Sequence, residues 1–165
     1  MDPSISCCFT GHRPAKLPWG TNEHDPRCRN LKAEIAARLE GIYEAGYRHF
    51  ICGMAAGCDL YFAEAVLALR REHPEVTLEA AIPCDGQADS WPAALRRRYE
   101  ALAADCDEVT MLQHAYTPGC MQRRNAYMVG RSSLLLAVYD GRPGGTMSTI
   151  LLARRSGLKV VTIEL

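Results

Sequence analysis

The residues best suited to binding an anion follow the first apolar run of the sequence. Thr10, Gly11, His12 and Arg13 come directly after "CCF" at residues 7–9. A histidine can donate a hydrogen bond or a proton near neutral pH, and an arginine can bind a phosphate through two parallel hydrogen bonds. We therefore expect these four residues to face an anionic ligand.

Two glycine-rich segments offer a second kind of anion contact. "GMAAGCD" (residues 53–59) and "DGRPGGT" (residues 140–146) each follow an apolar run and precede an amphipathic one. Glycine lets the backbone approach a phosphate, and the free N–H groups at a helix start favour it. Neither segment is a P-loop or a G-x-G-x-x-G fingerprint, so kinase, GTPase and ordinary dehydrogenase functions lose their usual support. The candidate ligand contacts here are Gly53, Ala55, Gly57, Asp59, Asp140, Gly144, Gly145 and Thr146.

Short apolar runs alternate with longer amphipathic ones along the whole chain. This alternation predicts an α/β fold, a Rossmann-like three-layer sandwich with a mainly parallel sheet of about six strands flanked by helices. In such a sheet the carboxyl ends of the strands share one edge, and ligands bind there. The segments described above all leave the sheet at that edge. The predicted strands are residues 5–9, 49–52, 77–82, 108–112, 134–139 and 159–163.

Helix-spaced apolar residues from Leu31 to Ile42 predict the first helix, which Gly46 ends. Asp59 can cap the second helix and Ser90 the third, because both types accept hydrogen bonds from free N–H groups at helix starts. Asp59 is equally a candidate to bind a ribose hydroxyl. The irregular residues 14–28 are expected to form either a functional loop or a disordered one, in which Trp19 is a packed anchor rather than a base-stacking surface. Two further helices are expected over residues 121–130 and 146–155.

Composition narrows the choice of partners. The chain has 165 residues, so we expect one domain over residues 1–165, and its 19 basic residues equal its 19 acidic ones. That balance makes nucleic acid an unlikely partner. The eight cysteines include no C-x-x-C and no Cys/His cluster. We therefore expect reduced thiols, a cytoplasmic location and no metal site, and no apolar run is long enough for a membrane span.

Four segments together resemble a known family. "FTGHRP", "GMAAGCD", "RRNAYM" and "DGRPGGT" resemble the YpsA-type branch of the SLOG superfamily, which groups DprA-like and LOG-like Rossmannoid domains. The resemblance implies a pocket for a nucleotide-derived ligand, with ADP-ribose, NAD-like molecules and nucleoside monophosphates as candidates. It also adds Arg124 and Asn125 to the site and leaves a homodimer open. We expect no bound cofactor.

The resemblance leaves three functions to weigh, and enzymatic activity stays open among them. The leading hypothesis is a sensor whose ligand controls a protein partner; the alternatives are a LOG-type N-ribosyl hydrolase and DprA-like single-stranded DNA binding. Ser148 and Thr149 fall where the LOG pattern has its catalytic glutamate and its neighbour. Hydroxyl groups stabilise an oxocarbenium-like ribose poorly, so a hydrolase would need Asp59, Asp85 or Asp140.

Arg124 and Asn125 have a competing interpretation, because both could instead lie on a solvated helix face. Asp140, at the end of a buried strand, needs a partner, because an unpaired carboxylate there would be costly. A backbone N–H, a ligand hydroxyl or Arg124 could fill that role.

Overall fold

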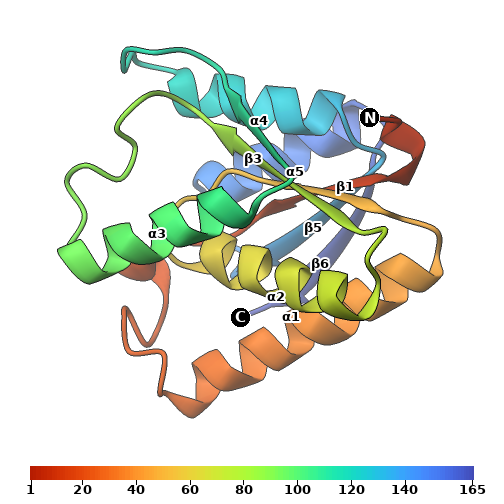
Figure 1. Ribbon diagram of the computed structural model, residues 1–165, viewed down its shortest axis with the longest axis horizontal. Coiled ribbons are helices and arrows are strands. Elements are labelled where there is room, and N and C mark those ends of the chain that lie inside the picture. Colours follow the sequence, from red (N-terminus) through yellow and green to blue (C-terminus); the bar gives the residue numbers. More distant parts are fainter.

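The structure is a computed structural model that describes residues 1–165. Figure 1 shows a twisted sheet between two layers of helices. The strands are β1 (Ser6–Thr10), β2 (His49–Cys52), β3 (Thr77–Ile82), β4 (Glu108–Met111), β5 (Leu134–Tyr139) and β6 (Lys159–Glu164). The α-helices are α1 (Pro26–Glu44), α2 (Cys58–Glu72), α3 (Ala93–Asp105), α4 (Cys120–Gly130) and α5 (Gly145–Arg155). Two short 3-10 helices, η1 (Pro3–Ile5) and η2 (Pro14–Lys16), flank β1.

All six strands run parallel in the order β4-β3-β2-β1-β5-β6. The chain builds the sheet outward from β1 to β4 and then returns to the other side of β1 with β5. The strand order therefore reverses between β1 and β5, where Cys7 pairs with Leu134 and Thr10 with Ala137. In open parallel sheets, this reversal leaves a crevice beyond the carboxyl ends of the two strands. The predicted Rossmann-like fold is confirmed.

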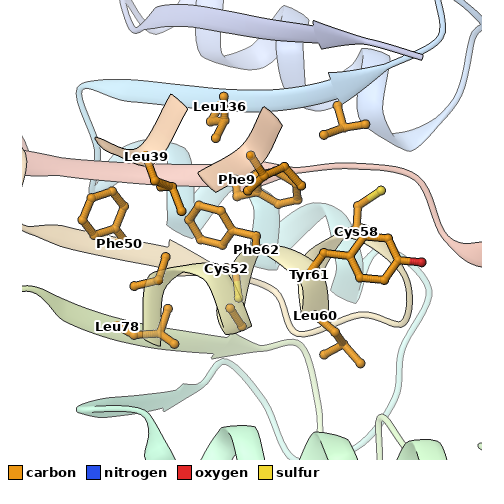
Figure 2. Packing of buried hydrophobic residues seen from close by; sticks show 14 of the residues in the cluster. Phe9, Leu39, Phe50, Cys52, Cys58, Leu60, Tyr61, Phe62, Leu78 and Leu136 are labelled. Carbon is orange, nitrogen blue, oxygen red and sulfur yellow. The ribbon is translucent and has the colours of Figure 1, made fainter. Parts of the chain in front are cut away.

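Both faces of the sheet are covered by helices. Helices α1, α2 and α3 pack on one face, and α4 and α5 on the other (Figure 1). Because neighbouring strand residues point to opposite faces, Phe9 lies in the larger core and Cys8 in the smaller one. In Figure 2 the ring of Phe9 lies beside Phe62 of α2, with the ring centroids 4.5 Å apart. Strand β1 is thus packed on both faces of the sheet, and this packing fixes the position of the residues that follow it.

Two predicted helix starts are wrong. Helix α2 begins at Cys58 with Gly57 before it, and Asp59 does not cap it; its carboxylate accepts the N–H of Ala55 in the preceding turn instead. Helix α3 begins at Ala93 after Pro92, and Ser90 lies too far upstream to cap it. Pro92 itself stands at the cap position, and no side chain caps this helix.

The irregular segment is shorter than expected. Asp25 accepts the Arg27 N–H at 2.8 Å, and α1 begins at Pro26. Trp19 is 7% exposed and donates its Nε1–H to the Tyr61 hydroxyl at 3.2 Å. This contact agrees with the predicted role of Trp19 as a packed anchor, and it leaves the indole unable to stack on a base. No helix of the structure has both the length and the apolar character that crossing a membrane requires.

Candidate functional site

A cavity of about 560 Å³ lies beyond the carboxyl ends of β1 and β5, where the strand order reverses. Its walls come from the turn after β1, the turn before α2, one face of α4 and the first turn of α5. The sequence-predicted residues that line it are Thr10, Gly11, His12, Arg13, Ala55, Asp59, Arg124, Asn125, Gly144, Gly145 and Thr146. Gly53, Gly57 and Asp140 do not line it.

The turn after β1 brings an exposed cation to the cavity mouth. A Cβ on Gly11 would lie 2.6 Å from Cys58 Cβ, so only glycine lets this turn pass the start of α2. Arg13 is exposed and forms no ion pair; its guanidinium contacts only the Met121 sulfur, at 3.6 Å. It is therefore free to bind an anion in the cavity.

His12 is 4% exposed and is held between two polar side chains. Its Nε2 lies 3.1 Å from Asp140 Oδ1, and its Nδ1 lies 3.4 Å from the Thr146 hydroxyl. The Asp140 backbone N–H also points at Nε2, at 3.3 Å, so both the main chain and the carboxylate of Asp140 hold this side of the ring. The backbone N–H of Arg142, then the His12 ring, lower the pKa of Asp140. Asp140 thus meets a backbone N–H and His12, and does not meet Arg124.

Arg124 is 4% exposed, so the interpretation of a solvated helix face is wrong for it. Its Nη1 donates to the Gly53 carbonyl at 2.6 Å and to the Ala81 carbonyl at 3.4 Å, and its Nε donates to Asn125 Oδ1 at 2.8 Å. Any Cβ on Gly53 would collide with this guanidinium. Gly53 therefore makes room for Arg124 and does not line the cavity itself. Burial lowers the pKa of Arg124.

Asp59 is a buried carboxylate that faces the cavity. Its residue is 7% exposed, and its Oδ2 accepts the Ala55 N–H at 3.0 Å. Burial raises the pKa of Asp59, while the charge of Arg124 opposes that shift. Gly57 shapes the turn before it, with a φ of +91°, and a Cβ there would lie 2.8 Å from the His12 carbonyl oxygen.

The first turn of α5 forms another wall. Gly145 is exposed and has no atom within 4 Å of where a Cβ would lie, so its backbone is open to the cavity. The hydroxyls of Ser148 and Thr149 donate back to the carbonyls of Gly144 and Gly145 at 3.1 and 3.0 Å. Both hydroxyls that align with the LOG glutamate and its neighbour therefore donate to their own helix, and Ser148 also lines the cavity.

Three residues that the sequence did not single out also line the cavity: Lys16 at the end of η2, and Met121 and Gln122 in α4. Lys16 is exposed and forms no ion pair. It is the only lysine between residues 14 and 28, and this was the one feature of the sequence that could have pointed to it as a ligand contact. Asp85, one of the three carboxylates named for a hydrolase, lies away from the cavity and pairs with His114 at 3.0 Å.

These features define a class: a Rossmann-like α/β protein with a ligand-sized cavity where the strand order of its sheet reverses. The YpsA family model, described as the YspA SLOG family, matches residues 7–155. The chain belongs to this family.

Curated relatives of similar sequence carry only a family designation. The UPF0398 protein of Bacillus pumilus is 28% identical over 140 residues, covering 83% of this chain and 74% of that protein. The UPF0398 protein of Bacillus thuringiensis is 28% identical over 151 residues, covering 90% of this chain and 82% of the relative. These likenesses agree with the family membership and name no ligand.

Two solved structures share the fold. DNA processing protein A (DprA) from Streptococcus pneumoniae has a TM-score of 0.65 at 16% identity, with 98% of this chain matching 51% of that one. DNA processing protein A from Helicobacter pylori, described for its single-stranded DNA binding mode, has a TM-score of 0.63 at 14% identity, with 99% matching 66%. This chain spans only about half and two thirds of those proteins, and identities this low show a common fold alone.

Proposed function

We propose that the protein binds a nucleotide or nucleotide-derived ligand in the cavity at the sheet edge and acts as a sensor that controls a protein partner. ADP-ribose, NAD-like molecules and nucleoside monophosphates are the candidate ligands. The observation that carries the proposal is the convergence of free cations and open backbone on one cavity of about 560 Å³. That volume is in the range of small-molecule sites.

Different residues of the cavity suit different groups of such a ligand. The guanidinium of Arg13 and the open backbone of Gly145 suit a phosphate, because a cation and free helix N–H groups both favour negative charge. Asp59 suits a ribose hydroxyl, which can donate to a carboxylate. Hydrogen bonds to the protein fix His12 and Arg124, so a ligand that bound beside them would not need to reorder either side chain.

Thermal unfolding with AMP, ADP-ribose and NAD tests the proposal, with released base or ribose phosphate followed in the same samples. A ligand at about 100 times its Kd should stabilise the fold by about 2.7 kcal/mol without any product. Arg13→Ala should reduce this stabilisation. Arg97→Ala, which removes an exposed arginine of α3 far from the cavity, should leave it unchanged. Equal stabilisation of both variants, or none in the parent protein, would contradict the proposal.

A hydrolase is the second candidate, and Asp59 is the observation that favours it. Of the three carboxylates named from the sequence, only Asp59 lines the cavity, and its raised pKa suits a general acid. Product release from ADP-ribose or a nucleoside monophosphate that Asp59→Asn abolishes would favour this function over the sensor. The engaged hydroxyls of Ser148 and Thr149 favour the sensor.

Single-stranded DNA binding is the third candidate. It is favoured by the fold shared with the H. pylori protein and by the exposed cations Arg13 and Lys16, which line the cavity. A gel shift with single-stranded DNA that weakens steeply with salt would support it. The balanced charge of the chain favours a small ligand instead.

A further inference from the structure

Strand β4 is an open edge of the sheet, and it leaves apolar side chains exposed. It stands first in the order β4-β3-β2-β1-β5-β6, so its outer side pairs with no strand. Val109 is 52% exposed and Met111 is 43% exposed. At the other edge the large apolar residues of β6 are buried or half-buried: Val160, Val161 and Ile163. The edge at β4 is therefore the one where a partner strand would cover the most apolar surface.

The two exposed side chains of β4 lie on the same face of the sheet, beside α3. Residues two apart in a strand share a face, and Val109 and Met111 both line a hollow of about 170 Å³ together with Tyr99 and Ala103 of α3. Helix α3 therefore reaches β4 without covering it. Proteins commonly protect an open edge strand with lysine or proline, and β4 contains neither. This edge is thus suited to pairing with another strand.

The backbone of the same two residues is free to form hydrogen bonds. The Leu112 N–H donates to the Ile82 carbonyl at 2.9 Å, so Leu112 turns its backbone groups toward β3. Because the backbone groups of successive strand residues point to alternate sides, those of Val109 and Met111 point away from β3. Each of these two residues offers a partner strand one donor and one acceptor.

A second copy of β4 matches this edge when the two strands run antiparallel. With Thr110 opposite its own counterpart on the twofold axis, Val109 of each copy lies opposite Met111 of the other. Each of these valine–methionine pairs can then exchange both of its backbone hydrogen bonds. The twofold axis also keeps the α3 faces of the two copies side by side, so the exposed side chains of each pair touch and cover one another.

Charges at the two ends of β4 favour the same antiparallel arrangement. Glu108, at the start of the strand, is exposed and forms no ion pair. Arg123 of α4 lies at the other end, where its Nη1 donates to Gln113 Oε1 at 3.1 Å, and it also forms no ion pair. An antiparallel pair brings Glu108 of each copy toward Arg123 of the other, on the α4 face of the joined sheet. A parallel pair would instead place like charges side by side.

We propose that the β4 edge is a homodimer interface, in which two copies join their sheets through antiparallel β4 strands. Val109 and Met111 form its apolar centre, and Glu108 with Arg123 forms its charged rim. Strands β2 and β3 separate β4 from the cavity beyond β1 and β5, so that cavity stays open in both copies. The inference goes beyond the proposed function and does not depend on which ligand binds.

Sedimentation velocity at protein concentrations from about 1 to about 300 μM tests the interface. The mass should rise with concentration from that of one chain toward that of two, since a small interface gives a weak dimer. Val109→Lys should weaken the dimer at least about tenfold, because a lysine on an open edge opposes strand pairing. The matched control is Leu151→Lys, which places the same charge at an exposed leucine of α5 and should leave the dimer unchanged.

An exchange of charges tests the strand direction. Glu108→Arg and Arg123→Glu should each weaken the dimer about threefold, and the double variant should recover the affinity of the parent protein. A monomer at every concentration, a dimer that Val109→Lys leaves intact, or no recovery in the double variant would overturn the proposal. A mass that rises beyond two chains would also contradict it, because twofold pairing of one edge closes at a dimer.

Discussion

The carboxyl group of Asp59 is buried, and burial disfavours its ionised form. Its pKa is raised, so the ionised form costs stability at every pH above the folded-state pKa, and that cost vanishes below the ordinary value of 3.8. Asp59→Asn, which resembles the protonated acid, should therefore raise the free energy of unfolding at pH 7. The gain should disappear as the pH falls below 3.8. Urea unfolding at several pH values measures it.

Asp85→Asn is the control for that substitution. Asp85 is exposed and lies outside the cavity, so its replacement should change stability by no more than about 0.5 kcal/mol. Loss of stability in Asp59→Asn at pH 7 would show that the carboxylate is structural. Gain of stability with loss of ligand binding would show that it is kept for function.

Gly11 and Gly41 make a matched pair of glycines. Gly11→Ala would place a Cβ 2.6 Å from Cys58 Cβ, and overpacking of this kind costs about 1–3 kcal/mol. Gly41→Ala lies in an exposed turn of α1 with nothing within 4 Å, so it should stabilise the protein by about 0.5–1 kcal/mol. Denaturant midpoints for the two variants should move in opposite directions. A shift of both midpoints in the same direction would show that the turn after β1 can move to accommodate a Cβ at residue 11.

Among the elements, β2, β3, β4 and α4 are joined by a buried polar network. Glu79, 3% exposed, lies 2.8 Å from His49 Nε2 and accepts hydrogen bonds from Thr110 at 2.8 Å and from the Tyr127 hydroxyl at 2.6 Å. Burial alone would raise the pKa of Glu79, but the three contacts outweigh it and lower the pKa. Glu108 lies close enough to His49 and Glu79 to share a metal ion with them, yet the two buried side chains are already satisfied by protein groups.

This network predicts a pH-dependent stability. Tyr127→Phe should cost about 1.5–3 kcal/mol at pH 7, because it removes a hydrogen bond to a charged group. A lowered carboxyl pKa contributes stability above the unfolded value of 4.5 and loses it as the pH falls through the folded-state value. The deficit of the variant should therefore shrink below pH 4.5. Tyr116→Phe, at a 70% exposed position, should show no deficit; a deficit of Tyr127→Phe that is constant with pH would contradict the assignment to Glu79.

The elements differed in how far the sequence alone could predict them. Residues 49–52, 77–82 and 134–139 match β2, β3 and β5 at both ends, because apolar runs bounded by turn residues leave few alternatives. Helix starts were less predictable. Asp59 is a good capping residue by type, but its carboxylate bonds the preceding turn, and that choice depends on tertiary packing.

At the scale of the whole molecule, the topology explains why so much of the candidate site was predictable. Parallel strands bring their carboxyl ends to one edge, so residues far apart in sequence, such as Arg13 and Thr146, were expected to meet. The place of Lys16 was not predictable in the same way. It depends on how η2 folds back over Gly144, which no periodicity of the sequence encodes.

The net charge of the chain does not reveal how charged residues are distributed over its surface. The formal net charge is zero, yet Arg13 and Lys16 stand unpaired at the cavity. An anionic ligand would thus be attracted by a few nearby charges rather than by the field of the protein. Because such contacts are exposed, affinity for the ligand should fall moderately between 50 and 500 mM salt, on the order of a few-fold for two charges. Calorimetry at two salt concentrations measures this fall, and an affinity independent of salt would exclude these cations from binding.

A crystal structure of the protein grown with ADP-ribose would show whether the ligand binds at the sheet edge. We expect ligand density in the cavity beyond β1 and β5, with phosphate oxygens within hydrogen-bond distance of Arg13 and the Gly145 N–H. A ligand bound elsewhere on the surface, or a cavity that stays empty at saturating ADP-ribose, AMP and NAD, would contradict it.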